Sequence, residues 1–138
     1  MLAFLAAALV YHATVIHGVD GDTLRVAIHG WPKPVNPIDV RVVGIDTPEH
    51  MRPPAQSDCE VGLGLKAALY ARGLVKPGDT VTLTWSGHHE KYGRFLGAVT
   101  LPDGRDWAAT MIAAGLGRAY GVDGDLHKAP WCADPASQ

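Results

Sequence analysis

The fold is decided by residues 13–45, ATVIHGVDGDTLRVAIHGWPKPVNPIDVRVVGI. Apolar residues recur at every second position in parts of this stretch, and that period is typical of β-strands. Asp20-Gly21 is a tight-turn signal, and three prolines within 30–37 predict a loop. We therefore predict three strands in succession, at 13–19, 22–29 and 38–45.

The rest of the chain adds a helix, two strands and a second helix. Ser57 and Glu60 match a capping box, so a helix begins there, and it ends before Pro77. We expect its apolar stripe at Val61, Leu65, Ala68 and Leu69. The later strands are expected at 79–85 and 93–100, and the second helix at 106–114 with Gly115 as its C-cap candidate.

The order β-β-β-α-β-β-α predicts an α+β fold, a five-stranded OB-fold β-barrel with helices packed on it. Short strands separated by turns argue against a parallel doubly wound sheet. The chain has 138 residues, 47% of them hydrophobic and 19% charged, which suits a single globular domain at 13–138. Its formal net charge of −2 excludes a strongly basic protein that holds nucleic acid by bulk electrostatics.

Residues 1–12 form an apolar N-terminal segment that is too short to span a bilayer. It is either the apolar part of a signal peptide or an apolar terminal strand or helix. Cys59 and Cys132 form no CxxC pair, so they indicate either one disulfide or two free thiols, and we favour the disulfide. A secreted or periplasmic monomer with no stable membrane association is the resulting prediction.

Acids and arginines gather at the expected strand ends. Carboxylates with a backbone carbonyl suit a hard cation such as Ca²⁺, two guanidinium groups suit a phosphate, and a further carboxylate can orient a water. Together these parts describe phosphodiester hydrolysis. Taken singly, each has an ordinary structural interpretation as a turn, a loop entry or a surface ion pair. The residues in this set are Asp22, Arg41, Asp46, Thr47, Glu49 and Arg94.

The chain closely resembles the staphylococcal-type thermonuclease family, in its shorter bacterial branch. The matching segments are VDGDT at 19–23, RVVGIDTPE at 41–49, KYGR at 91–94, DG at 103–104 and AGL at 114–116. The resemblance implies an OB-fold nuclease that needs Ca²⁺ and cuts both DNA and RNA.

Individual roles follow from the same resemblance, position by position. Asp22, Asp46 and the Thr47 carbonyl resemble the Ca²⁺ ligands, and Glu49 resembles the proposed general base. Arg41 and Arg94 resemble the arginines that hold the scissile phosphate. Lys91 and Tyr92 resemble contacts to nucleotide phosphates, and Tyr120 resembles an aromatic on which a base stacks.

The chain also departs from the family. The usual acidic residue early in the middle helix is not evident in 61–64, where Gly62 and Gly64 weaken the helix by roughly 0.5–1 kcal/mol each. Ala108 and Thr110 replace polar residues of the second helix. The family's C-terminal third helix is not expected here, and the short C-terminal tail that contains Trp131 and Cys132 is expected to pack back toward Cys59.

Two other functions remain open. A non-catalytic OB-fold module for nucleic acid or protein would need neither the acids nor the arginines. A structural Ca²⁺ domain explains the acids but leaves Arg41 and Arg94 without a role.

Overall fold

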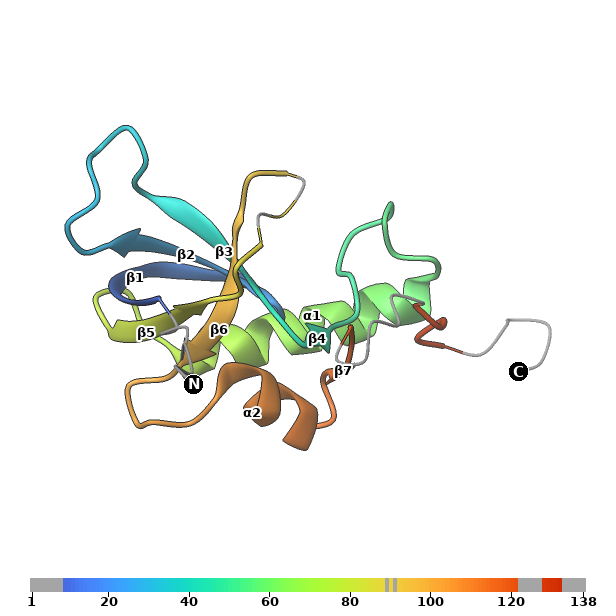
Figure 1. Ribbon diagram of the computed structural model, residues 1–138. Helices are drawn as coiled ribbons and strands as arrows, with labels where there is room; N and C mark the ends of the chain where they lie inside the picture. Colours follow the sequence, from blue (N-terminus) through green and yellow to red (C-terminus); the bar gives the residue numbers. More distant parts are fainter. Residues whose placement is uncertain (1–8, 89, 91, 122–127, 133–138) are drawn as a thin grey trace, which may run out of the picture.

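The computed structural model describes residues 9–88, 90, 92–121 and 128–132. Its five long strands close a barrel in the order β1-β2-β3-β6-β5 (Figure 1). Neighbouring strands are antiparallel except for β3 and β6, which run parallel. The barrel strands are β1 (Val10–Asp20), β2 (Thr23–Ile28), β3 (Ile38–Val42), β5 (Thr80–Trp85) and β6 (Phe95–Thr100). The prediction of a five-stranded OB-fold barrel is therefore confirmed.

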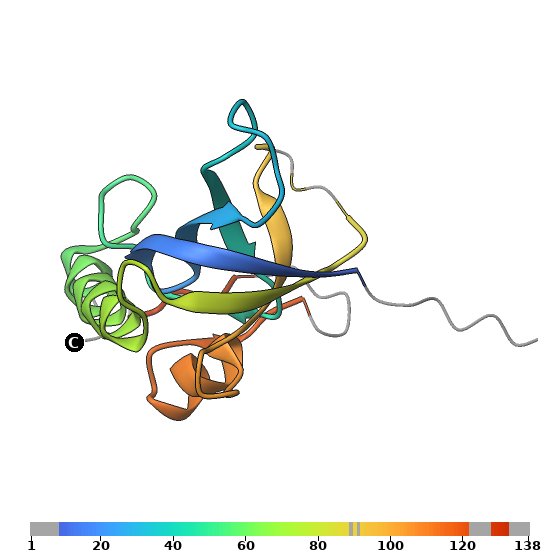
Figure 2. The same cartoon turned by 90° about the vertical axis from the view of Figure 1, so that its left-hand side faces the viewer.

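The helices of the described part of the chain lie outside the barrel, as both views show (Figures 1 and 2). Helix α1 (Asp58–Leu74) packs beside β1, and α2 (Trp107–Ala113) packs against β6. The short strands β4 (Ile45–Asp46) and β7 (Arg118–Ala119) pair with each other, which brings the C-terminal part of the chain beside the segment after β3. No helix in the described part of the chain is long and apolar enough to cross a membrane.

The barrel core consists of inward-facing strand residues and one face of each helix. In β2, for example, Leu24, Val26 and Ile28 are buried, as the alternation predicts. Helix α2 adds Trp107, which is fully buried, and its Nε1 donates to the carbonyl of Gly21 at 2.9 Å. This hydrogen bond ties α2 to the turn between β1 and β2.

Helix α1 begins as predicted but turns a different face to the barrel. Ser57 is its N-cap and accepts a hydrogen bond from the Glu60 amide at 3.1 Å. The expected stripe is wrong at Leu65 and Leu69, which are 50% and 65% exposed, whereas Ala68 is buried as predicted. The buried face consists of Glu60, Gly64, Ala67, Ala68 and Ala71. Small side chains on this face let the helix lie close to the barrel.

The observed bounds of two strands differ from the predicted ones, and the pairing between strands explains the difference. Strand β1 begins at Val10, not at 13, because residues 10–12 pair with β5, so part of the expected N-terminal segment belongs to the barrel. The strand expected at 38–45 breaks after Val42, since Gly44 takes a left-handed φ of 80°. The two residues after this turn then pair with β7 instead of continuing along the barrel.

Candidate active site

Two loops that carry acids meet at one end of the barrel. Asp22 lies in the β1–β2 turn, and Asp46 and Thr47 lie at and after β4; all three are less than one-tenth exposed. The two loops touch at Gly21, where an added Cβ would lie 2.8 Å from the Cβ and Oγ1 of Thr47. A glycine is therefore needed in the turn for the loops to approach this closely.

Asp22 is held by its own neighbours. Thr23 Oγ1 donates to one carboxylate oxygen at 3.0 Å, and Arg41 Nη2 lies 3.4 Å from the other. The Arg41 guanidinium also donates to the carbonyls of Val42 and Ile45, the latter at 2.9 Å. These contacts fix Arg41 beside the acids at the point where β3 ends.

Asp46 is paired with two cations that the sequence analysis missed. Arg118 Nη2 lies 2.9 Å from its Oδ2, and Lys128 Nζ lies 3.4 Å from its Oδ1. Both cations come from the segment after α2, and no sequence motif marks either of them. Trp131 lies 4.1 Å below the Arg118 guanidinium, whose Nη2 also donates to the carbonyl of Ala129.

The C-terminal segment is joined to α1 by a disulfide between Cys59 and Cys132, the pairing that the sequence analysis favours. This segment lies against Asp46, because Arg118 and Lys128 both pair with the Asp46 carboxylate. A pocket of about 110 Å³ lies here, between the acid loop of Asp46, Thr47 and Glu49 and the cations Arg118 and Lys128.

Negative charge is concentrated around Glu49 and Asp20. Burial raises the pKa of Glu49 above its usual value, the nearby Asp22 raises it further, and Lys128 opposes the change. Burial and the Asp22 carboxylate together raise the pKa of Asp20 to about 7. A bound cation would favour the ionised form of these carboxylates and lower their pKa values.

The donor atoms suit the Ca²⁺ that the resemblance implies. Within the described residues, no three His, Cys, Asp or Glu side chains converge on one metal position. The expected set needs only two carboxylates, of Asp22 and Asp46, because its third ligand is the carbonyl oxygen of Thr47. All three donors are oxygens, which hard cations prefer, and the crowded acids favour a positive ion.

Arg94 directly precedes β6 and is held by Glu90. Its Nη2 lies 2.7 Å from Glu90 Oε1, and the same carboxylate accepts from the backbone amides of Tyr92 and Arg94. The hydrogen bond to Glu90 raises the pKa of Arg94, so the guanidinium stays charged. Arg94 Nε is buried and has no hydrogen-bond partner in the part of the chain that the structure describes.

One cleft of about 1170 Å³ brings most of the expected residues together. Arg41, Glu49, Arg94, Tyr92 and Tyr120 all line it. Tyr92 is 74% exposed, whereas the backbone amide of Tyr120 donates to the carbonyl of Gly44 at 3.0 Å. Lys91, the other residue expected to contact a nucleotide phosphate, lies outside the described residues.

The barrel makes this chain an OB-fold protein, with two arginines and a cluster of carboxylates at one cleft. The family model described as "Staphylococcal nuclease homologue" matches residues 39–130. The chain therefore belongs to the staphylococcal nuclease homologue family, and the resemblance found in the sequence is confirmed.

Two relatives are similar to this chain, and both are named "Uncharacterized endonuclease", from Escherichia coli O157:H7 and from Escherichia coli. Each is 30% identical over 109 residues, which cover 79% of this chain and 61% of the relative. The chain thus matches about three-fifths of the length of these relatives.

Proposed function

We propose that this chain is a Ca²⁺-dependent nuclease that hydrolyses phosphodiester bonds of DNA and RNA. The observation that carries the proposal is that Arg41, Arg94 and Glu49 line one cleft beside the buried acids Asp22 and Asp46. Membership of the family and the names of the two relatives support a nuclease in general.

The two arginines bind the scissile phosphate. Arg41 is fixed by the carbonyls of Val42 and Ile45, so it presents its charge without much loss of side-chain freedom on binding. Among the described residues, the buried Nε of Arg94 has no partner, and its Nη2 is paired with Glu90, which a phosphate oxygen can displace. Two guanidinium groups together offset the charge that develops on the phosphate during attack.

Glu49 orients the attacking water and accepts its proton. Its raised pKa brings the carboxylate closer to the basicity that proton transfer near neutral pH requires. Asp22, Asp46 and the Thr47 carbonyl would hold Ca²⁺, which supplies positive charge that polarises the phosphate and lowers the pKa of water. Lys91, Tyr92 and Tyr120 contact the nucleotides on either side, with Tyr120 as a stacking surface for a base.

Cleavage of single-stranded DNA and of RNA, with Ca²⁺ and with a chelator, tests the proposal. We expect cleavage that needs Ca²⁺ and that falls by orders of magnitude in Arg94→Ala and Glu49→Gln. Arg105→Ala is the matched control, because Arg105 pairs with Asp103 on the surface, away from the cleft. A folded wild-type chain that cuts neither substrate would rule the proposal out.

A non-catalytic nucleic-acid or protein binding module is the second candidate, and one observation favours it. Both oxygens of Asp46 are already paired with cations of the chain itself, so this carboxylate has partners without a metal. A module of this kind would bind single-stranded DNA equally well with Ca²⁺ and with chelator, and would not cut it.

We also propose that the chain is a secreted or periplasmic monomer. The Cys59–Cys132 disulfide supports an oxidising compartment, since such bonds persist there and are rare in the cytosol. Fractionation of the producing cell, with free thiols counted in each fraction, tests the compartment. Light scattering of the purified chain tests the monomer.

A further inference from the structure

Glu60 of α1 is buried and faces the loop that carries Glu49. Only 5% of it is exposed, and both of its carboxylate oxygens accept backbone hydrogen bonds from that loop. Oε2 accepts from the Glu49 amide at 3.0 Å, and Oε1 accepts from the Gln56 amide at 3.1 Å. Hydrogen bonds from amides to a charged carboxylate are the stronger kind, so both ends of the loop are fastened to the helix.

Gly64, one helical turn later, allows the same peptide to lie directly on α1. A Cβ at this position would lie 2.3 Å from the carbonyl carbon and oxygen of Glu49 and 2.6 Å from the His50 nitrogen. Glycine weakens a helix relative to alanine, so its presence here needs a reason, and the close approach supplies one. Gly62 of the same helix has nothing within 4 Å of its Cβ position.

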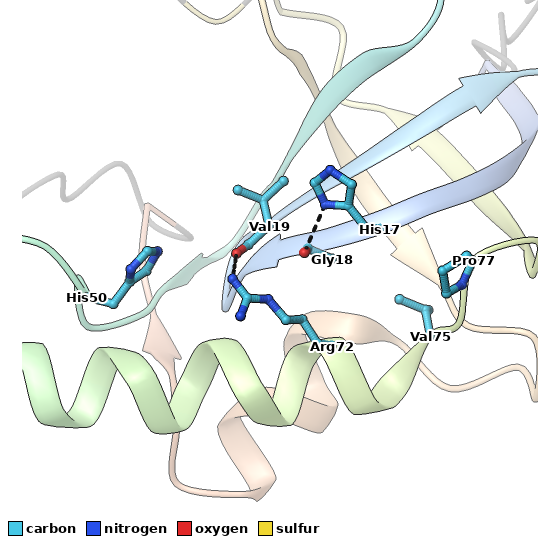
Figure 3. Close-up of a pocket in the computed structure, with 7 residues that line it drawn as sticks. All are labelled: His17, Gly18, Val19, His50, Arg72, Val75 and Pro77. Carbon is cyan, nitrogen blue, oxygen red and sulfur yellow. Dashed lines mark hydrogen bonds between the residues drawn. The ribbon is translucent and has the colours of Figure 1, made fainter.

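The far end of α1 holds the other acid loop. Arg72 Nη2 donates to the carbonyl of Val19 at 3.0 Å, just before the turn that carries Asp22 (Figure 3). The Cβ position of Gly18 lies only 3.2 Å from Arg72 Cγ, so strand and helix are close here too. A hollow of about 450 Å³ lies beside these contacts, and His50 and Arg72 help to line it (Figure 3).

We propose that Glu60 and Gly64 are positioning residues that hold the Glu49 backbone in place for the reaction, a role that rests on the nuclease function proposed above. Glu60 fastens the Glu49 amide, and Gly64 sets how deep the peptide lies on the helix. Because α1 also holds Val19, one rigid element sets the relative position of Glu49 and the turn of Asp22. Displacement of a reacting group by about 1 Å lowers rates by about 100-fold, so the position that α1 gives to Glu49 should affect the rate strongly.

The variants Glu60→Gln and Gly64→Ala test the proposal, with Gly62→Ala as the matched control. Gln has the shape of Glu but only one acceptor oxygen, so one of the two amides loses its partner. Ala at 64 pushes the Glu49–His50 peptide off the helix, whereas Ala at 62 enters open space. We expect kcat to fall about 10-fold or more in the two test variants, with KM within about twofold of wild type. The control should keep the wild-type kcat.

A second background separates positioning from general damage. If Glu60 acts through Glu49, then Glu60→Gln introduced into Glu49→Gln should lower kcat no further. A purely structural effect would instead reduce kcat by the same factor in both backgrounds, and that result overturns the proposal. Melting temperatures of all variants identify any chain that fails to fold, and Glu60→Gln keeps the test available if Gly64→Ala does not fold.

Hydrogen exchange of the Glu49 amide gives a readout that needs no activity. We expect this amide to exchange faster in Glu60→Ala, which removes both acceptor oxygens, than in wild type, and to exchange at the wild-type rate in Gly62→Ala. Unchanged exchange in Glu60→Ala, or a wild-type kcat in Glu60→Ala while Glu49→Gln is slow, overturns the positioning role. A wild-type kcat in Glu49→Gln would instead contradict the proposed role of Glu49 itself. Failure of the positioning role and failure of the proposed function can therefore be distinguished.

Discussion

The guanidinium of Arg118 lies 2.9 Å from the carboxylate of Asp46, a residue that the family resemblance assigns to the metal. Asp46 is only 3% exposed in its side chain, so the pair is largely shielded from water on that side. Lys128 lies at the other oxygen, and both cations reach the site from the C-terminal segment. A metal at Asp46 therefore has to compete with side chains of the chain itself.

Replacement of Arg118 by Ala tests whether Arg118 competes with Ca²⁺ for the Asp46 carboxylate. Without Ca²⁺, the variant leaves a buried carboxylate that keeps Lys128 as its one cationic partner among the described residues, and we expect a loss of about 1–3 kcal/mol of stability. With Ca²⁺, the freed carboxylate binds the ion more tightly, so the rise in melting temperature on adding Ca²⁺ should exceed that of wild type. Thermal unfolding with and without Ca²⁺ measures both effects.

Arg105→Ala is the control for this experiment, because Arg105 and Asp103 form an exposed pair that is worth little. A rise on adding Ca²⁺ that is equal in wild type and Arg118→Ala would show that Arg118 does not compete with the ion.

The disulfide between Cys59 and Cys132 should stabilise the fold substantially. It joins two residues that are 73 positions apart, and closing a loop of that length is expected to contribute about 2–4 kcal/mol. The double variant Cys59→Ser/Cys132→Ser should therefore unfold at lower denaturant concentration than wild type. Wild type under reducing conditions should match the variant, and equal midpoints for oxidised wild type and the variant would contradict the prediction.

The barrel could be predicted because each strand carries its own signal. Alternation in β2 and turn residues at Asp20-Gly21 act over a few residues, so the sequence alone reveals them. The packing face of α1 could not be predicted in this way. Its exposed Leu65 and Leu69 are more apolar than the buried Gly64, and only the closeness of the barrel explains why the small residues face inward.

The candidate site residues could be proposed from the sequence because they lie in short motifs, such as DGDT and DTPE. Arg118 and Lys128 were missed because their position depends on the pairing of β4 with β7 and on the path of the segment tied by Cys132. Glu60 was identified only as part of a capping box. Its second role, at the amides of Glu49 and Gln56, depends on how the loop folds back over the helix.

Removal of the charge of Glu90 should strengthen substrate binding. In the free protein this carboxylate occupies Nη2 of Arg94, so a phosphate has to displace it. The pair is partly exposed and worth up to about 1 kcal/mol, and we expect KM for single-stranded DNA to fall about two- to fivefold in Glu90→Gln. The control is Asp103→Asn, which should leave KM unchanged because its partner Arg105 lies away from the cleft. An unchanged or higher KM in Glu90→Gln would mean that Arg94 does not bind the phosphate in this way.

Asp20 should make the metal-free chain less stable as the pH rises. Its pKa is about 7 in the folded chain, against 3.8 for the ordinary group, so the folded state binds more protons between these two values. The free energy of unfolding therefore falls as the pH rises from about 4 to 7, and the loss is complete above pH 7. Asp20→Asn removes the titrating group but keeps an oxygen that can accept from the Asp22 amide. In chelator at pH 8, we expect this variant to be more stable than wild type by up to about 4 kcal/mol, and the difference should vanish near pH 4. Denaturant unfolding at the two pH values measures it, and a wild type that is at least as stable as Asp20→Asn at pH 8 would show that Asp20 ionises without penalty.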